Sequence, residues 1–179
     1  WDIDATYLYS VKVDLASAKG SPDGATQDTE VVSFGIRTIA FTAEDGFQLN
    51  GKKEQLSDYG GLLVVDLWAS WCGPCIDSLP HLTAIAEQYK SQGVTVVGIS
   101  VDRDMADARR ALRKAKVSYP SPWGGPEAMQ QAHVRSIPAV FILDSDLTVL
   151  AFVSGYRDND TRIQDHLDAI LESPQSESD

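Results

Sequence analysis

One stretch restricts the fold more than any other, because the apolar run LLVVDL (residues 62–67) leads within a few residues into WCGPC (residues 71–75). A continuous apolar run of this length is typical of a strand buried on both faces of a sheet. Apolar side chains then repeat at a spacing near 3.6 from residue 76 to 91, with Gly93 placed to end a helix. Two cysteines therefore lie where a buried strand passes into a helix.

The chain after residue 60 continues to alternate strands and helices. Further strands are predicted at 94–101, 139–143 and 150–154, and further helices at 105–116, 126–133 and 161–172. A β-α-β unit followed by a β-hairpin and a terminal helix predicts an α/β fold, with a mixed sheet and helices on both faces.

The first 40 residues have a different pattern. Residues 6–15 alternate apolar and polar side chains, and residues 30–41 are rich in β-branched and aromatic residues. They predict an N-terminal β-hairpin extension (1–40) ahead of the main domain (41–172). A two-stranded hairpin is marginal alone in water, so it should dock on the rest of the chain or on a partner. A dimer through these strands is one such arrangement.

The charge of the chain excludes some partners. Fifteen basic and 26 acidic residues give a net charge of −11, which opposes binding to nucleic acid because phosphates would be repelled. No apolar run approaches the roughly 20 residues that span a bilayer, so no membrane segment is expected. Residues 173–179 are acidic and serine-rich, and we expect a disordered tail. The start at Trp1 shows no secretory leader pattern, so we expect that an upstream segment was removed.

The cysteine pair could serve stability, metal binding or redox chemistry. A disulfide that closes so short a ring constrains little of the unfolded chain. A structural zinc site needs four ligands, and the three histidines (His81, His133 and His166) are scattered, so no metal site is expected. Redox chemistry fits the position of the pair better.

Thiol chemistry follows from the strand-to-helix position. Cys72 would lie at a helix N-terminus, where unpaired N–H groups stabilise a thiolate and lower the pKa of the thiol. A thiolate attacks a disulfide, and Cys75, one turn further on, can then release the substrate. Gly73 and Pro74 would fix the short turn between the two sulfurs.

The residues around this pair resemble a known family. VVDLWASWCGPC is similar to the thioredoxin signature, and residues from about 41 to 172 resemble the thioredoxin superfamily. The segments FTAEDG, GKKEQLSDYGG, SLPHL, GISVD and SIPAVFILD resemble its TlpA-like or ResA-like branch. The resemblance implies a thiol-disulfide oxidoreductase that reduces or exchanges protein disulfides and receives electrons from an upstream donor. It also implies a bacterial periplasmic or envelope location, and no cofactor other than the Cys72–Cys75 disulfide.

The resemblance also implies roles for single residues. Asp66 matches the buried acid that assists proton removal from the resolving cysteine, and burial should raise its pKa. Pro138 matches the cis-proline that faces the disulfide, and the backbone of Ile137 would pair with an extended substrate. The implied substrate-binding residues are Trp71, Gly73, Pro74, Ile137 and Pro138. Gly98 stands where thioredoxin has a lysine near the buried acid, so proton transfer is expected to be tuned differently.

A second resemblance covers residues 1–52. WDIDATYLYSVKVDL, VVSFGIRTIAF and DGFQLNGKK resemble the end of the immunoglobulin-like domain of family 2 glycoside hydrolases, which suggests a fusion or chimera. About 50 residues cannot complete such a sandwich, and no glycosidase activity is expected. Two alternatives to the oxidoreductase remain. One is a redox-inactive scaffold whose N-terminal segment covers the site, and the other is a carbohydrate-associated β-module that uses Trp1, Tyr7 and Tyr9.

Overall fold

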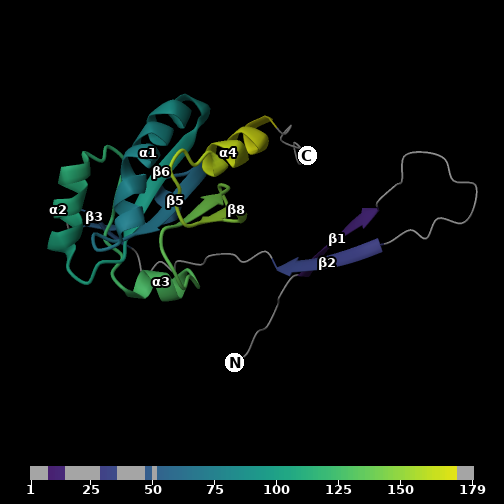
Figure 1. Ribbon diagram of the computed structural model, residues 1–179, viewed down its shortest axis with the longest axis horizontal. Coiled ribbons are helices and arrows are strands. Elements are labelled where there is room, and N and C mark those ends of the chain that lie inside the picture. The colour runs from purple at the N-terminus through teal and green to yellow at the C-terminus, as the bar shows by residue number, and fades with distance from the viewer. Residues whose placement is uncertain (1–7, 15–28, 36–46, 50–51, 173–179) are drawn as a thin grey trace, which may run out of the picture. The chain divides into compact units, whose positions relative to one another are not determined.

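The computed structural model describes residues 8–14, 29–35, 47–49 and 52–172, drawn as ribbon in Figure 1. The chain divides into two compact units, Trp1–Arg37 and Thr38–Asp179. The predicted tail at 173–179 lies outside the described residues. The domain boundaries at residues 40 and 172 stay predictions.

The first unit contains the predicted N-terminal hairpin. Strand β1 (Leu8–Asp14) pairs antiparallel with β2 (Thr29–Gly35), in a register that runs from Leu8 opposite Gly35 to Asp14 opposite Thr29. The end of the predicted second strand, beyond residue 35, lies outside the described residues, as do Trp1 and Tyr7. Docking of the hairpin and a dimer through its strands stay predictions.

The second unit is built on a four-stranded mixed sheet in the order β6-β5-β7-β8. The central strand β5 (Leu62–Trp68) runs parallel to β6 (Val94–Ser100) and antiparallel to β7 (Ala139–Leu143), which pairs antiparallel with β8 (Val149–Ser154). Every residue of β5 after Leu62 is at most 1% exposed. The continuous apolar pattern therefore identified the strand at the centre of the core.

Among the described residues, four α-helices lie around this sheet, with α1 and α4 above it and α3 below it in the view of Figure 1. They are α1 (Gly73–Tyr89), α2 (Met105–Ala115), α3 (Glu127–Gln131) and α4 (Arg162–Glu172). The Tyr89 hydroxyl donates to Asp168 at 2.7 Å, which ties α1 to α4. Helix α1 begins three residues earlier than predicted, because Pro74 fits a first turn whose N–H groups have no helical partner.

Short elements complete the second unit. Strands β3 (Phe47–Leu49) and β4 (Lys52–Glu54) form a small antiparallel hairpin. The two short 3-10 helices of the described residues are η1 (Leu56–Asp58) and η2 (Lys90–Gln92). The thioredoxin-like mixed α/β fold that the sequence predicted is thus present.

An extended segment beyond β6 was not predicted. The amide of Gly98 donates to the Pro120 carbonyl at 2.9 Å, and the amide of Ser100 donates to the Pro122 carbonyl at 3.0 Å. Proline breaks the pattern of a strand because it has no N–H to donate to a sheet. The two carbonyls nevertheless pair with β6, and this pairing places Tyr119 beside Gly98.

Candidate redox site

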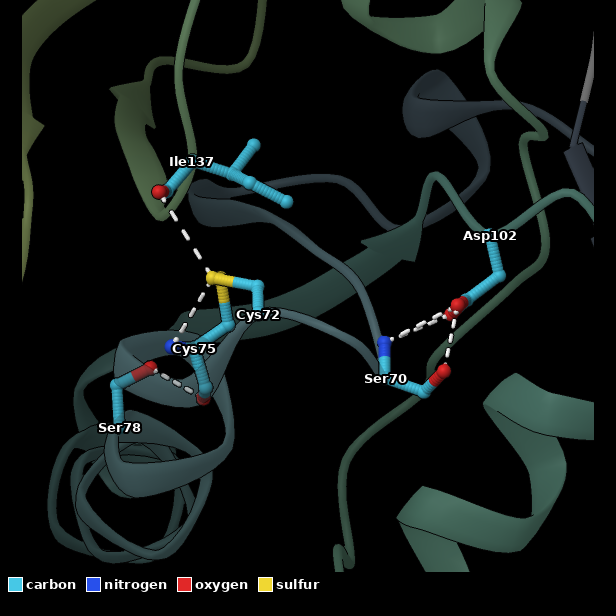
Figure 2. The surroundings of a disulfide bond; sticks show 6 residues. All are labelled: Ser70, Cys72, Cys75, Ser78, Asp102 and Ile137. Carbon is cyan, nitrogen blue, oxygen red and sulfur yellow. Dashed lines mark hydrogen bonds between the residues drawn. A yellow bond between two sulfur atoms is a disulfide. The ribbon is translucent and has the colours of Figure 1, made fainter.

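Cys72 and Cys75 form a disulfide at the N-terminus of α1, with 5.2 Å between their Cα atoms (Figure 2). Cys72 is the N-cap residue of the helix, and the Cys75 amide donates to its sulfur at 3.3 Å. Cys72 is 7% exposed, whereas Cys75 is completely buried. Cys72 is therefore the more exposed of the two cysteines, and the first turn of α1 directs an N–H group at its sulfur.

The loop before β7 approaches this disulfide from a distant part of the chain. The Ile137–Pro138 peptide bond is cis, and the Ile137 carbonyl oxygen lies 3.8 Å from the Cys72 sulfur. Figure 2 shows this carbonyl pointing toward the sulfur. Ile137 is half-buried and Pro138 is buried. The fold thus brings together the two segments that the sequence singled out separately.

The other predicted substrate-binding residues are exposed next to the disulfide. The Trp71 side chain is 67% exposed, so a large apolar surface lies directly beside Cys72 in the chain. Gly73 and Pro74, between the two cysteines, are exposed as well. By contrast, Trp68 is fully buried, and its indole N–H donates to the Ser121 hydroxyl at 3.1 Å. Of Trp68 and Trp71, Trp71 is therefore the one available to a partner.

Asp66 lies on the central strand and is fully buried, as its apolar neighbours predicted. Its register partners are Gly98 on β6 and Val140 on β7, and neither carries a charge. Neither carboxylate oxygen has a hydrogen-bond partner among the described residues. Burial raises the pKa of Asp66 from its ordinary value of 3.8 to about 7. The carboxyl can therefore gain or lose a proton near neutral pH.

Asp102 holds the loop that carries Trp71, and sequence reasoning did not single it out. Its two carboxylate oxygens accept from the Ser70 amide at 3.1 and 3.0 Å, and one of them accepts from the Ser70 hydroxyl at 2.7 Å (Figure 2). The Ser100 hydroxyl donates to the other oxygen at 2.8 Å. Asp102 is only 2% exposed. An Asp that directly follows a buried strand was the signal available in GISVD.

Replacing Asp102 tests this anchor. Asp102→Ala is expected to lower the free energy of unfolding by about 3 kcal/mol, because the half-buried Ser70 donors and the buried Ser100 hydroxyl lose a charged acceptor. Denaturant unfolding measures the change. Asp107→Ala is the matched control, since Asp107 is half-exposed in an ion pair with Arg110 and should change stability by less than about 1 kcal/mol. Equal stability of the two variants would contradict the anchoring role.

The described residues give no sign of a metal centre or a membrane span. Within residues 8–14, 29–35, 47–49 and 52–172, no three His, Cys, Asp or Glu side chains gather so as to hold a metal ion. Over the same ranges, no helix has the length and apolar character needed to cross a membrane.

Several proteins similar to this chain are named as thiol-disulfide oxidoreductases or interchange proteins. The chain is 27% identical over 143 residues to the thiol-disulfide oxidoreductase ResA of Bacillus subtilis, which covers 79% of this chain and 78% of the relative. A candidate thiol:disulfide interchange protein DsbE from Chlorobium tepidum has a similar structure, with a TM-score of 0.61, 29% identity, and coverage of 65% of this chain and 84% of that one. The thioredoxin domain of a thiol-disulfide oxidoreductase from Bacteroides vulgatus matches with a TM-score of 0.63 and 20% identity, over 70% of this chain and 91% of that one.

The AhpC/TSA family profile matches residues 35–152, which include the disulfide, Asp66 and Pro138. The likeness of residues 1–52 to a glycoside hydrolase domain, and the fusion that it suggests, stay predictions. The family match covers most of the chain and the similar structures share the thioredoxin fold, so this chain belongs to the AhpC/TSA family and is a thioredoxin-like thiol-disulfide oxidoreductase.

Proposed function

We propose that this protein reduces or exchanges protein disulfides through Cys72 and Cys75, without a bound cofactor. One observation carries the proposal: the disulfide joins a Cys72 near the surface, at a helix N-terminus, to a completely buried Cys75. Such an arrangement separates an attacking thiol from a resolving thiol.

The proposed reaction starts from the reduced protein. The Cys72 thiolate, stabilised by the N-terminus of α1 and by the Cys75 amide, attacks one sulfur of a substrate disulfide. A mixed disulfide forms, and the other substrate sulfur leaves as a thiolate. The Cys75 thiol then gives its proton to Asp66 and attacks the Cys72 sulfur. The Cys72–Cys75 disulfide closes, the second substrate thiolate leaves, and the substrate has gained two electrons.

Substrate binding in this proposal uses the residues around the disulfide. An extended peptide would pair with the backbone of Ile137, whose carbonyl already faces the Cys72 sulfur. The exposed Trp71 ring offers apolar contact area beside the sulfur. Pro138 also lines a small, mainly apolar hollow with His81, Tyr156 and Ile163.

Electron counting and thiol reactivity test the proposal together. The oxidised protein should take up two electrons from dithiothreitol and show two new thiols. The reduced protein should then speed the reduction of insulin disulfides. Fast alkylation of Cys72 at neutral pH is expected, because a thiolate is the reactive form. Slow alkylation with no insulin turnover would instead support the redox-inactive scaffold.

We also propose that the protein works outside the cytoplasm and receives electrons from an upstream dithiol donor. The support is the likeness to ResA and DsbE proteins, together with the need to reduce the Cys72–Cys75 disulfide after each turnover. An impermeant thiol reagent, applied to intact cells after mild reduction, should label Cys72. Labelling that requires lysis of the cells would contradict this location.

A further inference from the structure

Tyr119 occupies the space beside Asp66 that a side chain on β6 would otherwise fill. Gly98 is the register partner of Asp66 in the parallel pair of β5 and β6, so a side chain on Gly98 would extend over the same face of the sheet. A Cβ atom on Gly98 would lie only 2.9 Å from Cε2 of Tyr119. The absence of a side chain on Gly98 thus makes room for the Tyr119 ring.

The Tyr119 ring is held in place by its surroundings. Its segment runs along β6, to which the Pro120 carbonyl is hydrogen-bonded. Ser121 bonds both the Gly98 carbonyl, at 2.7 Å, and the Trp68 indole, at 3.1 Å. The side chain is only 7% exposed. The ring therefore has little freedom to turn away from this part of the core.

Tyr119 and Asp66 each have a buried polar group without a hydrogen-bond partner, and one of these groups can donate a hydrogen bond while the other accepts one. Among the residues that the structure describes, the buried side-chain nitrogen and oxygen atoms without a partner are the two Asp66 carboxylate oxygens and the Tyr119 hydroxyl oxygen. A carboxylate accepts hydrogen bonds, and a phenol can donate one. A buried polar group without a hydrogen-bond partner destabilises the fold. An interaction between the Tyr119 hydroxyl and the Asp66 carboxylate would remove that cost for both groups.

The neighbours of Asp66 offer no competing charge. Val140 on β7 and Gly98 on β6 are uncharged, and burial alone, with no contribution from a charged neighbour, raises the pKa of Asp66. Burial first, and then the charge of Asp66, raise the pKa of Tyr119 well above its ordinary value. The phenol therefore keeps its proton near neutral pH and remains a donor, and it is close enough to respond to the charge of Asp66.

We propose that Tyr119 is a positioning residue for Asp66, and that its hydroxyl donates a hydrogen bond to the charged carboxylate through one bridging water molecule. The inference rests on the proposed function, because it concerns the proton that Cys75 gives up during resolution. That proton passes to Asp66, while Tyr119 keeps its own proton throughout. The phenol thus stabilises the charged, proton-accepting form of Asp66 in a site that carries no lysine.

Tyr119→Phe removes only the hydroxyl and is the direct test. Loss of a donor to the carboxylate should raise the pKa of Asp66 by about one unit. The titration is followed by carbon NMR of the Asp66 carboxyl in the oxidised protein, where neither cysteine titrates. In the reduced protein, the pH midpoint of mixed-disulfide release should move upward by a similar amount. Below that midpoint, release should be about tenfold slower, because less Asp66 is charged.

Matched variants separate this role from a general loss of packing. Tyr89→Phe removes another buried hydroxyl, one that donates to Asp168, and it should leave the Asp66 titration unchanged. In an Asp66→Asn background, Tyr119→Phe should cause no further change in the pH profile of release. Gly98→Ala keeps the hydroxyl but pushes against the ring, and it should raise the Asp66 midpoint as Tyr119→Phe does.

An unchanged Asp66 titration in both Tyr119→Phe and Gly98→Ala overturns the inference. The NMR titration does not depend on turnover, so it also separates this result from failure of the proposed function. If the protein does not reduce disulfides, the wild type shows no insulin turnover, whatever the titration of Asp66.

Discussion

Cys72→Ser is expected to reduce insulin turnover at least about 100-fold, to the level of the uncatalysed reaction with dithiothreitol. A serine hydroxyl does not ionise near neutral pH, so the variant has no nucleophile at the more exposed of the two cysteine positions. The rate of insulin precipitation measures the loss. Normal turnover by Cys72→Ser would rule out the proposed mechanism.

Cys75→Ser provides the matched variant, because it removes the other sulfur of the same disulfide. It should also lose turnover, but for a different reason: the first attack still occurs, and nothing resolves the mixed disulfide. Mass spectrometry should then find substrate covalently bound at Cys72. Trapped substrate in Cys72→Ser rather than in Cys75→Ser would show that the two cysteines have exchanged roles.

Asp66→Asn should make the oxidised protein more stable at pH 8, by about 2 to 4 kcal/mol in the free energy of unfolding. The pKa of Asp66 is raised from 3.8 to about 7 in the folded protein, so the folded state binds this proton more tightly than the unfolded chain does. The free energy of unfolding therefore falls as the pH rises from about 4 to 7, at about 1.4 kcal/mol per pKa unit. The variant has no such charge to bury.

Denaturant unfolding of the oxidised protein between pH 4 and 8 measures this effect. The difference between Asp66→Asn and wild type should be largest above pH 7 and should shrink toward pH 4, where the unfolded chain also becomes protonated. Asp107→Asn, a change at a half-exposed carboxylate, is the control and should show no such trend. A gain that is the same at every pH would mean that burial of the Asp66 charge is not its source.

The same substitution is expected to slow resolution. Loss of the proton acceptor for Cys75 should reduce the rate of mixed-disulfide release about 100-fold near neutral pH. A residue that lowers stability and raises activity is a common compromise at a functional site. It also explains in physical terms why a carboxylate lies in the middle of an otherwise apolar central strand.

Local patterns predicted most elements of the second unit. The strand at 139–143 has the same bounds as β7, and the apolar run at 62–67 is β5 but for one residue. Such patterns succeed because a fully buried strand and an amphipathic helix each follow from the spacing of apolar side chains. The strand-like segment along β6 was missed, since Pro120 and Pro122 disrupt the local signal and the pairing depends on a distant strand.

The chemistry of the disulfide can be read from local sequence, because two cysteines three residues apart at a strand-to-helix junction need only local structure to meet. The surroundings of that disulfide depend on contacts between distant parts of the chain. Ser70 meets Asp102 across 32 residues, and the Cys72 sulfur meets the Ile137 carbonyl across 65. Tyr119 comes to lie near Asp66 because its segment pairs with β6 and Gly98 has no side chain. These contacts arise from the order of strands in the sheet, and strand order is a property of the whole fold rather than of any stretch of sequence.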